Sequence, residues 1–262
     1  MSGGTVGKAM DVLDQVATHG RPVRFASLLS ESDLPKATLY RLLQTLCHEG
    51  LVSFDRPSQT YSLGMRLVRL AHGAWAQSSL APIARPHLDR LSEQMAQTVH
   101  LAQLDAGQVL YVDKRNAAQP IDMFSDAGKV GPAYCTGVGK AMLAFLPLEE
   151  RDRALAQQSY HRFTDQTLGS PATLTEELEA IRARGYAFDR EEHEPGIICV
   201  AVPILSPQGR VLGALSITGS TRQITLDDLA AAAPLLMRCA TNIASEAEAW
   251  RFPDTTLQNT GT

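Results

Sequence analysis

The sequence predicts an α+β protein of two domains, and three observations support this class. The chain has 262 residues, 44% of them hydrophobic, which is enough apolar material for two cores. Apolar residues follow helical spacing through most of the chain up to Ala96, and alternating strand patterns begin at Val99. Strand pairs joined by tight turns then favour an antiparallel sheet flanked by helices.

The first domain is expected to span residues 1–63 and to begin with helices. Gly20 and Pro22 close the first of them, and Pro35 is suited to the first turn of the third, where its missing N–H costs nothing. Apolar spacing predicts helices over Val6–Ala17, over Phe25–Ser30, and from Pro35 to just before Gly50.

The third predicted helix has one apolar and one polar side. Leucines at 39, 42, 43 and 46 form a single stripe that must pack on the first two helices. The opposite side carries a guanidinium, an amide and hydroxyl groups, which are able to contact base edges or phosphates. The candidate DNA-contacting residues on this helix are Lys36, Thr38, Tyr40, Arg41 and Gln44.

A predicted hairpin follows this helix directly. Leu51–Phe54 and Tyr61–Leu63 read as strands around a polar turn, which places Arg56 and Gln59 at the tip. Three helices followed by a hairpin make a winged helix-turn-helix, with the wing positioned to meet a minor groove or the DNA backbone. The alternative is a merely solvated polar helix, since helix-turn-helix pairs also occur in proteins that bind no DNA.

The charge of the chain is unevenly distributed. Its net charge is −4, but residues 1–70 hold 8 Lys and Arg against 6 Asp and Glu, a net of +2, which leaves −6 for the remainder. Phosphate contact depends on local cations and not on the total charge, so the basic part of the chain lies where DNA binding is expected.

A connecting helix over residues 64–80 is apolar on more than one side, which is typical of burial between domains or subunits. The second domain is expected over residues 81–252, with a disordered tail over 253–262. Its predicted elements are a helix over 82–96, strands over 99–104 and 109–114, an extended segment at 131–135, helices over 137–146 and 174–184, strands over 186–190, 197–205 and 210–218, and a last helix from 226 to about 250.

Neither a membrane span nor a secretion signal is present in the sequence, which predicts a cytoplasmic protein. Cys47, Cys135, Cys199 and Cys239 are widely spaced and form no Cys-x-x-Cys pair. They are therefore expected to be reduced thiols and not zinc ligands or disulfides.

The stretch from Cys135 to Ala141 resembles a phosphate-binding loop only superficially. Tyr134 stands where a Walker A loop needs glycine, and Ala141 stands where it needs serine or threonine. Two alternatives remain open for this glycine-containing helix start. The free N–H groups at Gly137 and Val138 could hold a carboxylate, or the glycines could serve only packing.

Two further groups of polar residues lie in the second domain. Asp189, Glu191, Glu192, His193 and Cys199 could form a metal cluster or a Cys-His nucleophile pair, but their spacing matches no short metal motif. A buried neutral thiol is the default for Cys199 among its aliphatic neighbours. Ser216 and Thr218 share one face of a predicted buried strand, where a bound ligand could be their partner.

The chain resembles the IclR family of bacterial transcriptional regulators over roughly residues 5–250. The segments that carry the resemblance are "LPKATLYRLLQTLCHEGLV", "YSLGMRLVRL", "TGVGKAMLAFLP", "LEAIRARGYAFDREEHEPGIICVAVPI" and "VLGALSITG". This family pairs a winged helix with a GAF-like effector-binding domain. The resemblance therefore implies a recognition helix over residues 36–44 and a wing over residues 53–61.

The resemblance also implies an effector site at Gly137, Val138, Asp189, Cys199, Ser216 and Thr218, for a small carboxylate. The expected protein is a repressor without cofactor or metal that binds a near-palindromic operator in double-stranded DNA. A homodimer or a pair of dimers is expected. Two rivals are a hydrolase-like enzyme using Cys199 with His193 or Asp189, and a GAF-like interaction module without DNA binding.

Overall fold

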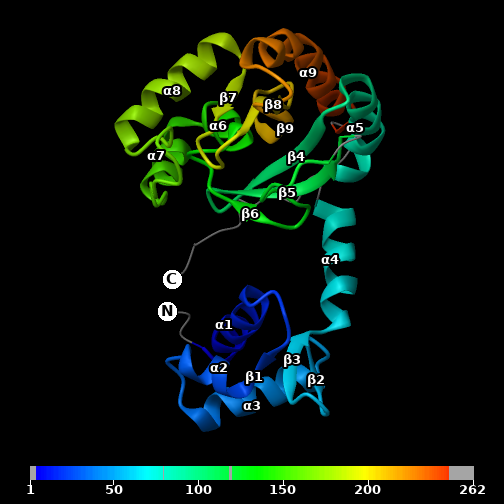
Figure 1. Cartoon of the computed structure of the whole chain (residues 1–262), viewed down its shortest axis with the longest axis vertical. Coiled ribbons are helices and arrows are strands. Elements are labelled where there is room, and N and C mark those ends of the chain that lie inside the picture. Colours follow the sequence, from blue (N-terminus) through cyan, green and yellow to red (C-terminus); the bar gives the residue numbers. More distant parts are fainter. Residues whose placement is uncertain (1–3, 79, 118–119, 248–262) are drawn as a thin grey trace. The chain divides into compact units, whose positions relative to one another are not determined.

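The computed structural model describes residues 4–78, 80–117 and 120–247 (Figure 1). The chain forms two compact units, Met1–Gln77 and Ser78–Thr262. The division lies close to the end of the predicted connecting helix, and the predicted tail over 253–262 lies outside the described residues. Within the described residues, no helix is both long and apolar enough to cross a membrane.

The first unit contains helices around a small antiparallel sheet with the strand order β1-β3-β2. The two-residue strand β1 was not predicted, because it is recognisable only from its pairing with β3, which sets Val23 opposite Tyr61. The elements are α1 (Thr5–Thr18), β1 (Val23–Arg24), α2 (Phe25–Ser30), α3 (Lys36–His48), β2 (Val52–Asp55), β3 (Thr60–Leu63) and α4 (Met65–Ser78).

The leucine stripe positions α3 on this unit. Leu39, Leu42, Leu43 and Leu46 are all buried in the core formed with α1 and α2. Pro35 lies at the N-cap and not in the first turn, and its carbonyl accepts hydrogen bonds from the amides of residues 38 and 39. Gly50 has a positive φ of 69° just after the helix, a conformation that glycine adopts without strain.

Helix α4 begins in tight contact with the end of α3. A Cβ atom at Gly64 would lie 2.1 Å from the carbonyl oxygen of Gly50, so only glycine allows this approach. Leu67 packs against the core of the unit, whereas Met65, Val68 and Leu70 are exposed. The prediction that α4 has apolar residues on more than one side is therefore correct.

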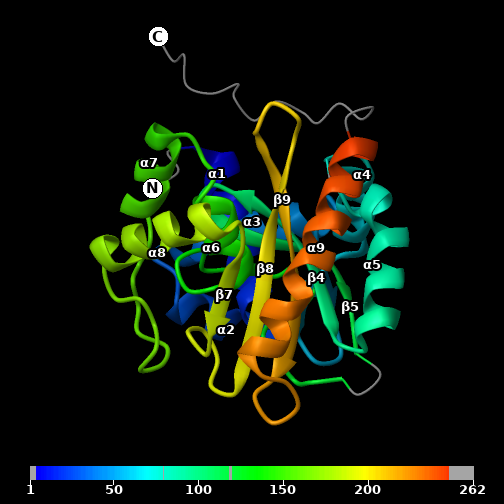
Figure 2. The same cartoon turned by 90° about the horizontal axis from the view of Figure 1, so that it is seen from above.

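The second unit is built on a six-stranded antiparallel sheet with the order β6-β5-β4-β9-β8-β7. Helices α6 and α8 pack on one face of the sheet, and α5 and α9 pack on the other (Figures 1 and 2). The elements are α5 (Ala81–Met95), β4 (Thr98–Asp105), β5 (Gln108–Arg115), β6 (Val130–Gly131), α6 (Gly137–Leu143), α7 (Leu148–Ala156), α8 (Pro171–Arg184), β7 (Ala187–Arg190), β8 (Ile197–Leu205), β9 (Val211–Ser220) and α9 (Leu226–Ala247).

The structure corrects the sequence prediction between residues 130 and 156. Only Val130 and Gly131 are strand residues, because they alone pair with β5, and the chain then turns into α6. Helix α6 ends at Leu143, before the predicted 146. Helix α7 was not predicted, since only Ala154 and Leu155 of this helix are buried, which leaves no extended apolar stripe. The predicted end of the last helix near 250 lies outside the described residues.

Candidate functional site

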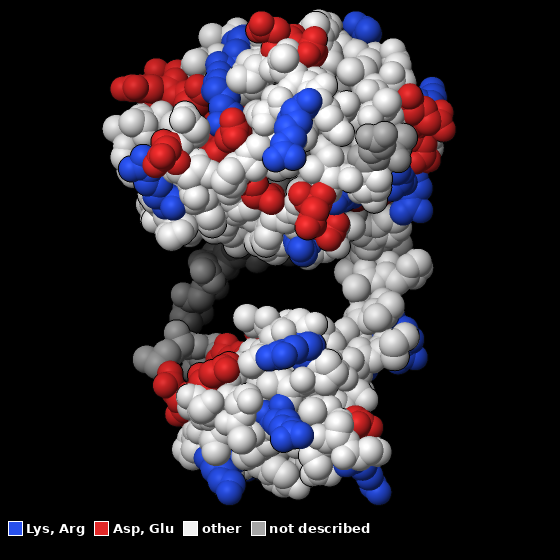
Figure 3. Space-filling view, in the orientation of Figure 1, with Lys and Arg blue, Asp and Glu red and all other residues white. Residues whose placement is uncertain are grey.

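The exposed side of α3 is the first candidate site. Burial of the leucine stripe turns the remaining side chains outward, as the helical spacing predicts. Figure 3 shows separate Lys and Arg side chains over the visible face of the N-terminal unit. Of the predicted DNA-contacting residues on α3, Lys36, Tyr40, Arg41 and Gln44 are exposed and Thr38 is half-buried.

Neighbouring residues fix part of this surface. The Tyr40 ring meets Phe25 of α2 edge-on, with the ring centroids 6.1 Å apart, so α2 supports the tyrosine, which remains 54% exposed. Within the described residues, neither Lys36 nor Arg41 takes part in a salt bridge. Both cations are therefore available to a phosphate or a base edge.

The turn of the β2–β3 hairpin is well ordered by its own hydrogen bonds. The Asp55 carboxylate accepts from the backbone N–H of Ser58 at 3.1 Å. The Gln59 backbone has a positive φ of 56°, and its side-chain amide donates to the carbonyl of Arg56 at 2.8 Å. Arg56 and Gln59 are both exposed at the tip, as predicted, but one N–H of Gln59 is already used within the turn.

The second candidate site lies on the face of the large sheet that α6 covers. Strand register places Asp189 of β7 opposite Cys199 of β8, and Cys199 opposite Thr218 of β9. Ser216 lies two residues before Thr218 and so shares its face. All four side chains are buried. Residues that are widely separated in the sequence are therefore neighbours across three strands.

Helix α6 contacts these buried strand residues through Gly137, its first residue. A Cβ atom at Gly137 would lie 2.4 Å from the Cys199 Sγ and 3.3 Å from the Ala201 Cβ, so the glycine is required for close packing. The Thr136 hydroxyl donates to the carbonyl of Pro132 and caps no amide of the helix. The Val138 side chain is part of the apolar core, so only its backbone could contact a ligand.

His100 of β4 is a polar member of this site that the sequence analysis missed. It lies opposite Ser216, and its Nδ1 is 3.3 Å from the Ser216 Oγ and 3.2 Å from the Thr218 Oγ1. Its Nε2 is 2.9 Å from the Oγ of Ser125, in the loop before β6. Alternation of side chains along β4 predicts which face of the strand carries His100. It does not predict that β9 lies beside β4, so the partners Ser216 and Thr218 could not be identified from the sequence.

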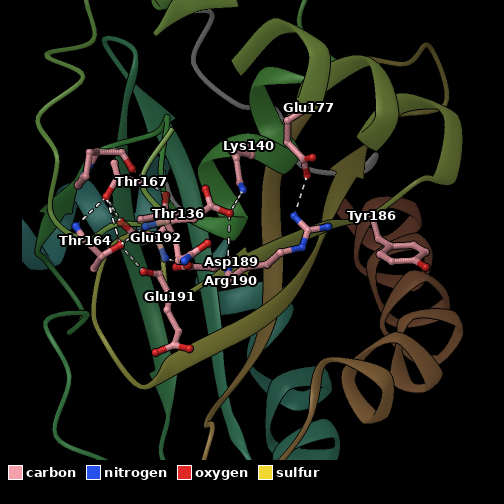
Figure 4. Close-up of polar contacts among 12 residues, drawn as sticks. Thr136, Lys140, Thr164, Thr167, Glu177, Tyr186, Asp189, Arg190, Glu191 and Glu192 are labelled. Carbon is pink, nitrogen blue, oxygen red and sulfur yellow. Dashed lines mark hydrogen bonds and ion pairs between the residues drawn. The ribbon is translucent and has the colours of Figure 1, made fainter. Parts of the chain in front are cut away.

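A braced turn holds Asp189 in place (Figure 4). The Asp189 carboxylate accepts from the backbone N–H of Glu192 at 2.8 Å. The Glu192 carboxylate forms a buried ion pair with Lys140 of α6, and its backbone carbonyl accepts from the Thr167 hydroxyl at 2.6 Å. Glu191 has a positive φ of 62° in this turn. Lys140 is thus committed to Glu192 and is not free to bind a ligand.

Burial keeps most titratable groups of the site uncharged. It raises the pKa of Asp189 to about 7, with the charge of Glu192 adding to the rise and Lys140 opposing it. It lowers the pKa of His100 to about 3, with Lys114 contributing. It also raises the pKa of the Cys199 thiol, an effect to which Asp189 adds. The site is therefore lined by a neutral imidazole, a neutral thiol and a carboxyl group poised near neutrality.

The burial and pairing of these residues test two alternatives that the sequence left open, a Cys-His nucleophile pair and a metal cluster. A buried thiol with a raised pKa is a poor nucleophile, because the thiolate is the reactive form. His193 pairs with Glu194 and packs against the ring of Phe163. Within the described residues, no group of three His, Cys, Asp or Glu side chains is arranged to hold a metal ion.

Comparison with known proteins matches the two units separately. Residues 5–56 match the family model described as IclR helix-turn-helix domain. Residues 72–245 match the model described as bacterial transcriptional regulator IclR C-terminal.

Individual proteins are similar over most of the chain. The HTH-type transcriptional regulator BhcR of Paracoccus denitrificans is 32% identical over 90% of this chain and 85% of its own length. The transcriptional repressor IclR of Escherichia coli is 29% identical over 90% of this chain and 87% of its own. The crystal structure of the Thermotoga maritima IclR aligns with a TM-score of 0.72 and 30% identity, covering 92% of this chain and 98% of that one.

Proposed function

The chain belongs to the IclR family of bacterial transcriptional regulators, and we propose that it is a repressor controlled by a small carboxylate effector. It is a DNA-binding regulator with a C-terminal effector domain and not an enzyme, as its named relatives are regulators. In the proposal, α3 and the wing bind a near-palindromic operator, and the effector binds between α6 and the large sheet.

The observation that carries the effector proposal is the buried polar cluster of His100, Asp189, Cys199, Ser216 and Thr218. Polar groups on a buried sheet face need partners; His100, Ser216 and Thr218 are partners of one another here, and a ligand could replace one of these contacts. The hydroxyls of Ser216 and Thr218 can each donate one hydrogen bond, and so can a protonated Asp189. Such donors suit a carboxylate oxygen.

The absence of a free cation from this cluster narrows the effector class. Lys140 is paired with Glu192, so a strongly charged phosphate would find only neutral donors among these described residues. A small monocarboxylate carries less negative charge, so it needs fewer cationic partners. In the proposal its remainder meets apolar side chains such as Met123 and Leu143, which are buried in the same unit. Sugar-derived keto acids and aromatic acids both fit this description.

The DNA-binding proposal depends on the exposed side of α3. Lys36 and Arg41 have unpaired charges within the described residues, and Gln44 presents an amide on the same surface. Arginine is suited to bidentate contact with guanine, and glutamine to contact with adenine. A dimer would present two such helices to two half-sites, which favours a near-palindromic operator.

Exposed apolar residues support a dimer or a pair of dimers. In the first unit, Met65, Val68 and Leu70 of α4 are exposed, and so are Val6 and Met10 of α1. Large exposed apolar side chains in one region commonly mark a protein–protein interface.

Thermal unfolding against a panel of keto acids and aromatic acids tests the effector proposal, since a ligand that binds only the folded state raises the midpoint. The acid that stabilises the protein should also change its affinity for labelled upstream DNA. The stabilisation should be reduced in Ser216→Ala, because one hydrogen-bond donor to the acid is removed. A stabilising acid that acts equally on Ser216→Ala would place the effector elsewhere in the chain.

A binding measurement at low salt separates the DNA-binding proposal from an interaction module without DNA binding. Nonspecific phosphate contact should retain any duplex even when its sequence is wrong. Failure to bind every duplex at low salt would contradict the proposed operator contacts.

A further inference from the structure

A groove of about 980 Å³ lies between the C-terminal half of α3, the wing and the first turns of α4. Its walls include Gln44 and His48 of α3, Ser53 and Arg56 of the wing, and Arg66 and Arg69 of α4. All of these residues belong to the first unit. Neither arginine of α4 is among the DNA contacts expected from the sequence, because α4 reads there only as a connecting helix.

We propose that this groove seats one phosphodiester strand of the bound DNA, with Arg66 and Arg69 as phosphate contacts outside the helix-turn-helix and wing. The inference depends on the proposed operator contacts of α3 and the wing. It adds a third DNA-contacting element to them.

The shape of the duplex supports this placement. Each phosphodiester strand of B-DNA separates a major groove from a minor groove. A protein that sets a helix in the major groove and a hairpin against the neighbouring minor groove must accommodate the intervening strand between the two projections. In this unit the space between α3 and the wing is the groove, and its third wall is the start of α4.

The charge of the groove matches this occupant. Arg56, Arg66 and Arg69 line it, together with His48. The carboxylate among its lining residues, that of Glu49, is paired with Arg66 at 2.5 Å, so this pair adds no net charge and the positive charge of the groove comes from Arg56 and Arg69. A groove lined by cations could bind either phosphate or an acidic peptide. Phosphate is favoured here because the adjacent surfaces of α3 and the wing are the proposed DNA contacts.

Contacts at the base of α4 hold Arg66 in position. Arg66 donates from Nη1 to the carbonyl oxygen of Glu49 at 2.8 Å, which leaves its other N–H groups free to bind phosphate. The Gly64 amide donates to the carbonyl of Leu51 at 2.8 Å. Arg69 lies three residues after Arg66 and so shares its side of the helix. Arg66 would therefore lose little conformational freedom on binding.

The test measures the affinity of the full-length protein for a labelled random-sequence duplex of about 30 base pairs, between about 50 and about 200 mM salt. The variants are Arg69→Ala, Arg66→Lys and Arg66→Ala. The charge-matched control is Arg21→Ala, an exposed arginine outside the groove. The midpoint of thermal unfolding is measured for each variant, so that loss of fold is recognised.

Arg69→Ala should weaken binding to random and upstream DNA by the same factor and reduce the slope of log affinity against log salt by about 0.9, the value for one lost phosphate contact. Arg66→Lys should retain the slope of the unchanged protein, and Arg66→Ala should reduce it by about 0.9. The inference is overturned if both alanine variants keep the slope of Arg21→Ala while remaining folded.

Arg41→Ala distinguishes this failure from failure of the proposed function. If Arg41→Ala weakens binding while the α4 variants do not, α3 binds DNA and the groove holds no strand. If the unchanged protein binds no duplex at low salt, both proposals fail together.

Discussion

Replacing Asp189 with asparagine is expected to remove most of the pH dependence of effector binding near neutral pH. Burial raises the pKa of this carboxyl to about 7, Glu192 contributes to the rise, and Lys140 opposes it. At that pH the group is about half protonated. Its protonated form can donate a hydrogen bond to a ligand carboxylate, whereas its ionised form repels one.

The sign of the effect follows from linkage. A bound anion near Asp189 raises the pKa of this group further, so binding takes up a proton. Affinity is then greatest below the pKa of the free protein and falls as the pH rises above it. One proton taken up corresponds to a fall of at most about tenfold per pH unit, or about 1.4 kcal/mol.

Cys199, Tyr111 and His100 do not contribute to the pH dependence near neutral pH. Burial raises the pKa of Cys199 and of Tyr111, and it lowers that of His100 to about 3. These groups therefore stay neutral on both sides of the pKa of Asp189. Glu192, Lys140 and His193 are the neighbours that act on the pKa of Asp189.

The assay is a calorimetric titration with the panel acid that stabilises the protein, performed below and above the pKa of Asp189. The unchanged protein should lose affinity with rising pH, and Asp189→Asn should bind with nearly constant affinity. Ser216→Ala is the matched control, since it should weaken binding while keeping the pH dependence. Constant affinity in the unchanged protein, or an equal loss in Asp189→Asn, would refute the reasoning.

Three other predictions test separate parts of the molecule. Arg41→Ala should weaken operator binding by roughly 1–3 kcal/mol if it contacts a base, and an equal loss on random duplex in an anisotropy titration would make it a phosphate contact. The lowered pKa of His100 means that the unfolded state binds more protons below its usual value of 6.5. Urea unfolding should therefore show stability falling by up to about 1.4 kcal/mol per pH unit as the pH decreases below that value, and His100→Asn should flatten this fall; an unchanged pH profile would contradict a buried neutral histidine. Lys140→Met should cost about 3–5 kcal/mol in the same urea assay by leaving Glu192 charged and unpaired, and adding Glu192→Leu should recover much of the loss, whereas equal instability of the double variant would point to lost packing.

The sequence predicts the first unit well because its signals are local. The leucines of α3 repeat within one helix, and the hairpin turn lies between two adjacent strands, so their positions need no information from distant residues. The exception is β1, whose two residues become a strand only by pairing with β3.

The second site is predictable only in part, since it is assembled across strands. Family motifs predict Asp189 and Cys199 as site residues, and strand alternation also points to Thr218, but the adjacency of the three depends on the order β9-β8-β7. His100 belongs to β4, on the other side of β9, and carries no motif of its own. Alternation identifies which face a residue occupies, but not which strand will lie beside it.

The contact between Gly137 and Cys199 limits how the effector specificity could be re-engineered. A methyl group at position 137 has no room beside the Cys199 sulfur, and a larger residue at 199 would collide with the helix in the same way. Position 199 therefore cannot be enlarged, because glycine at 137 has no smaller replacement, and position 137 can be enlarged only if position 199 becomes smaller. Attempts to admit bulkier acids at the proposed effector site should therefore begin at Ser216 and Thr218, which do not face this contact between Gly137 and the Cys199 sulfur.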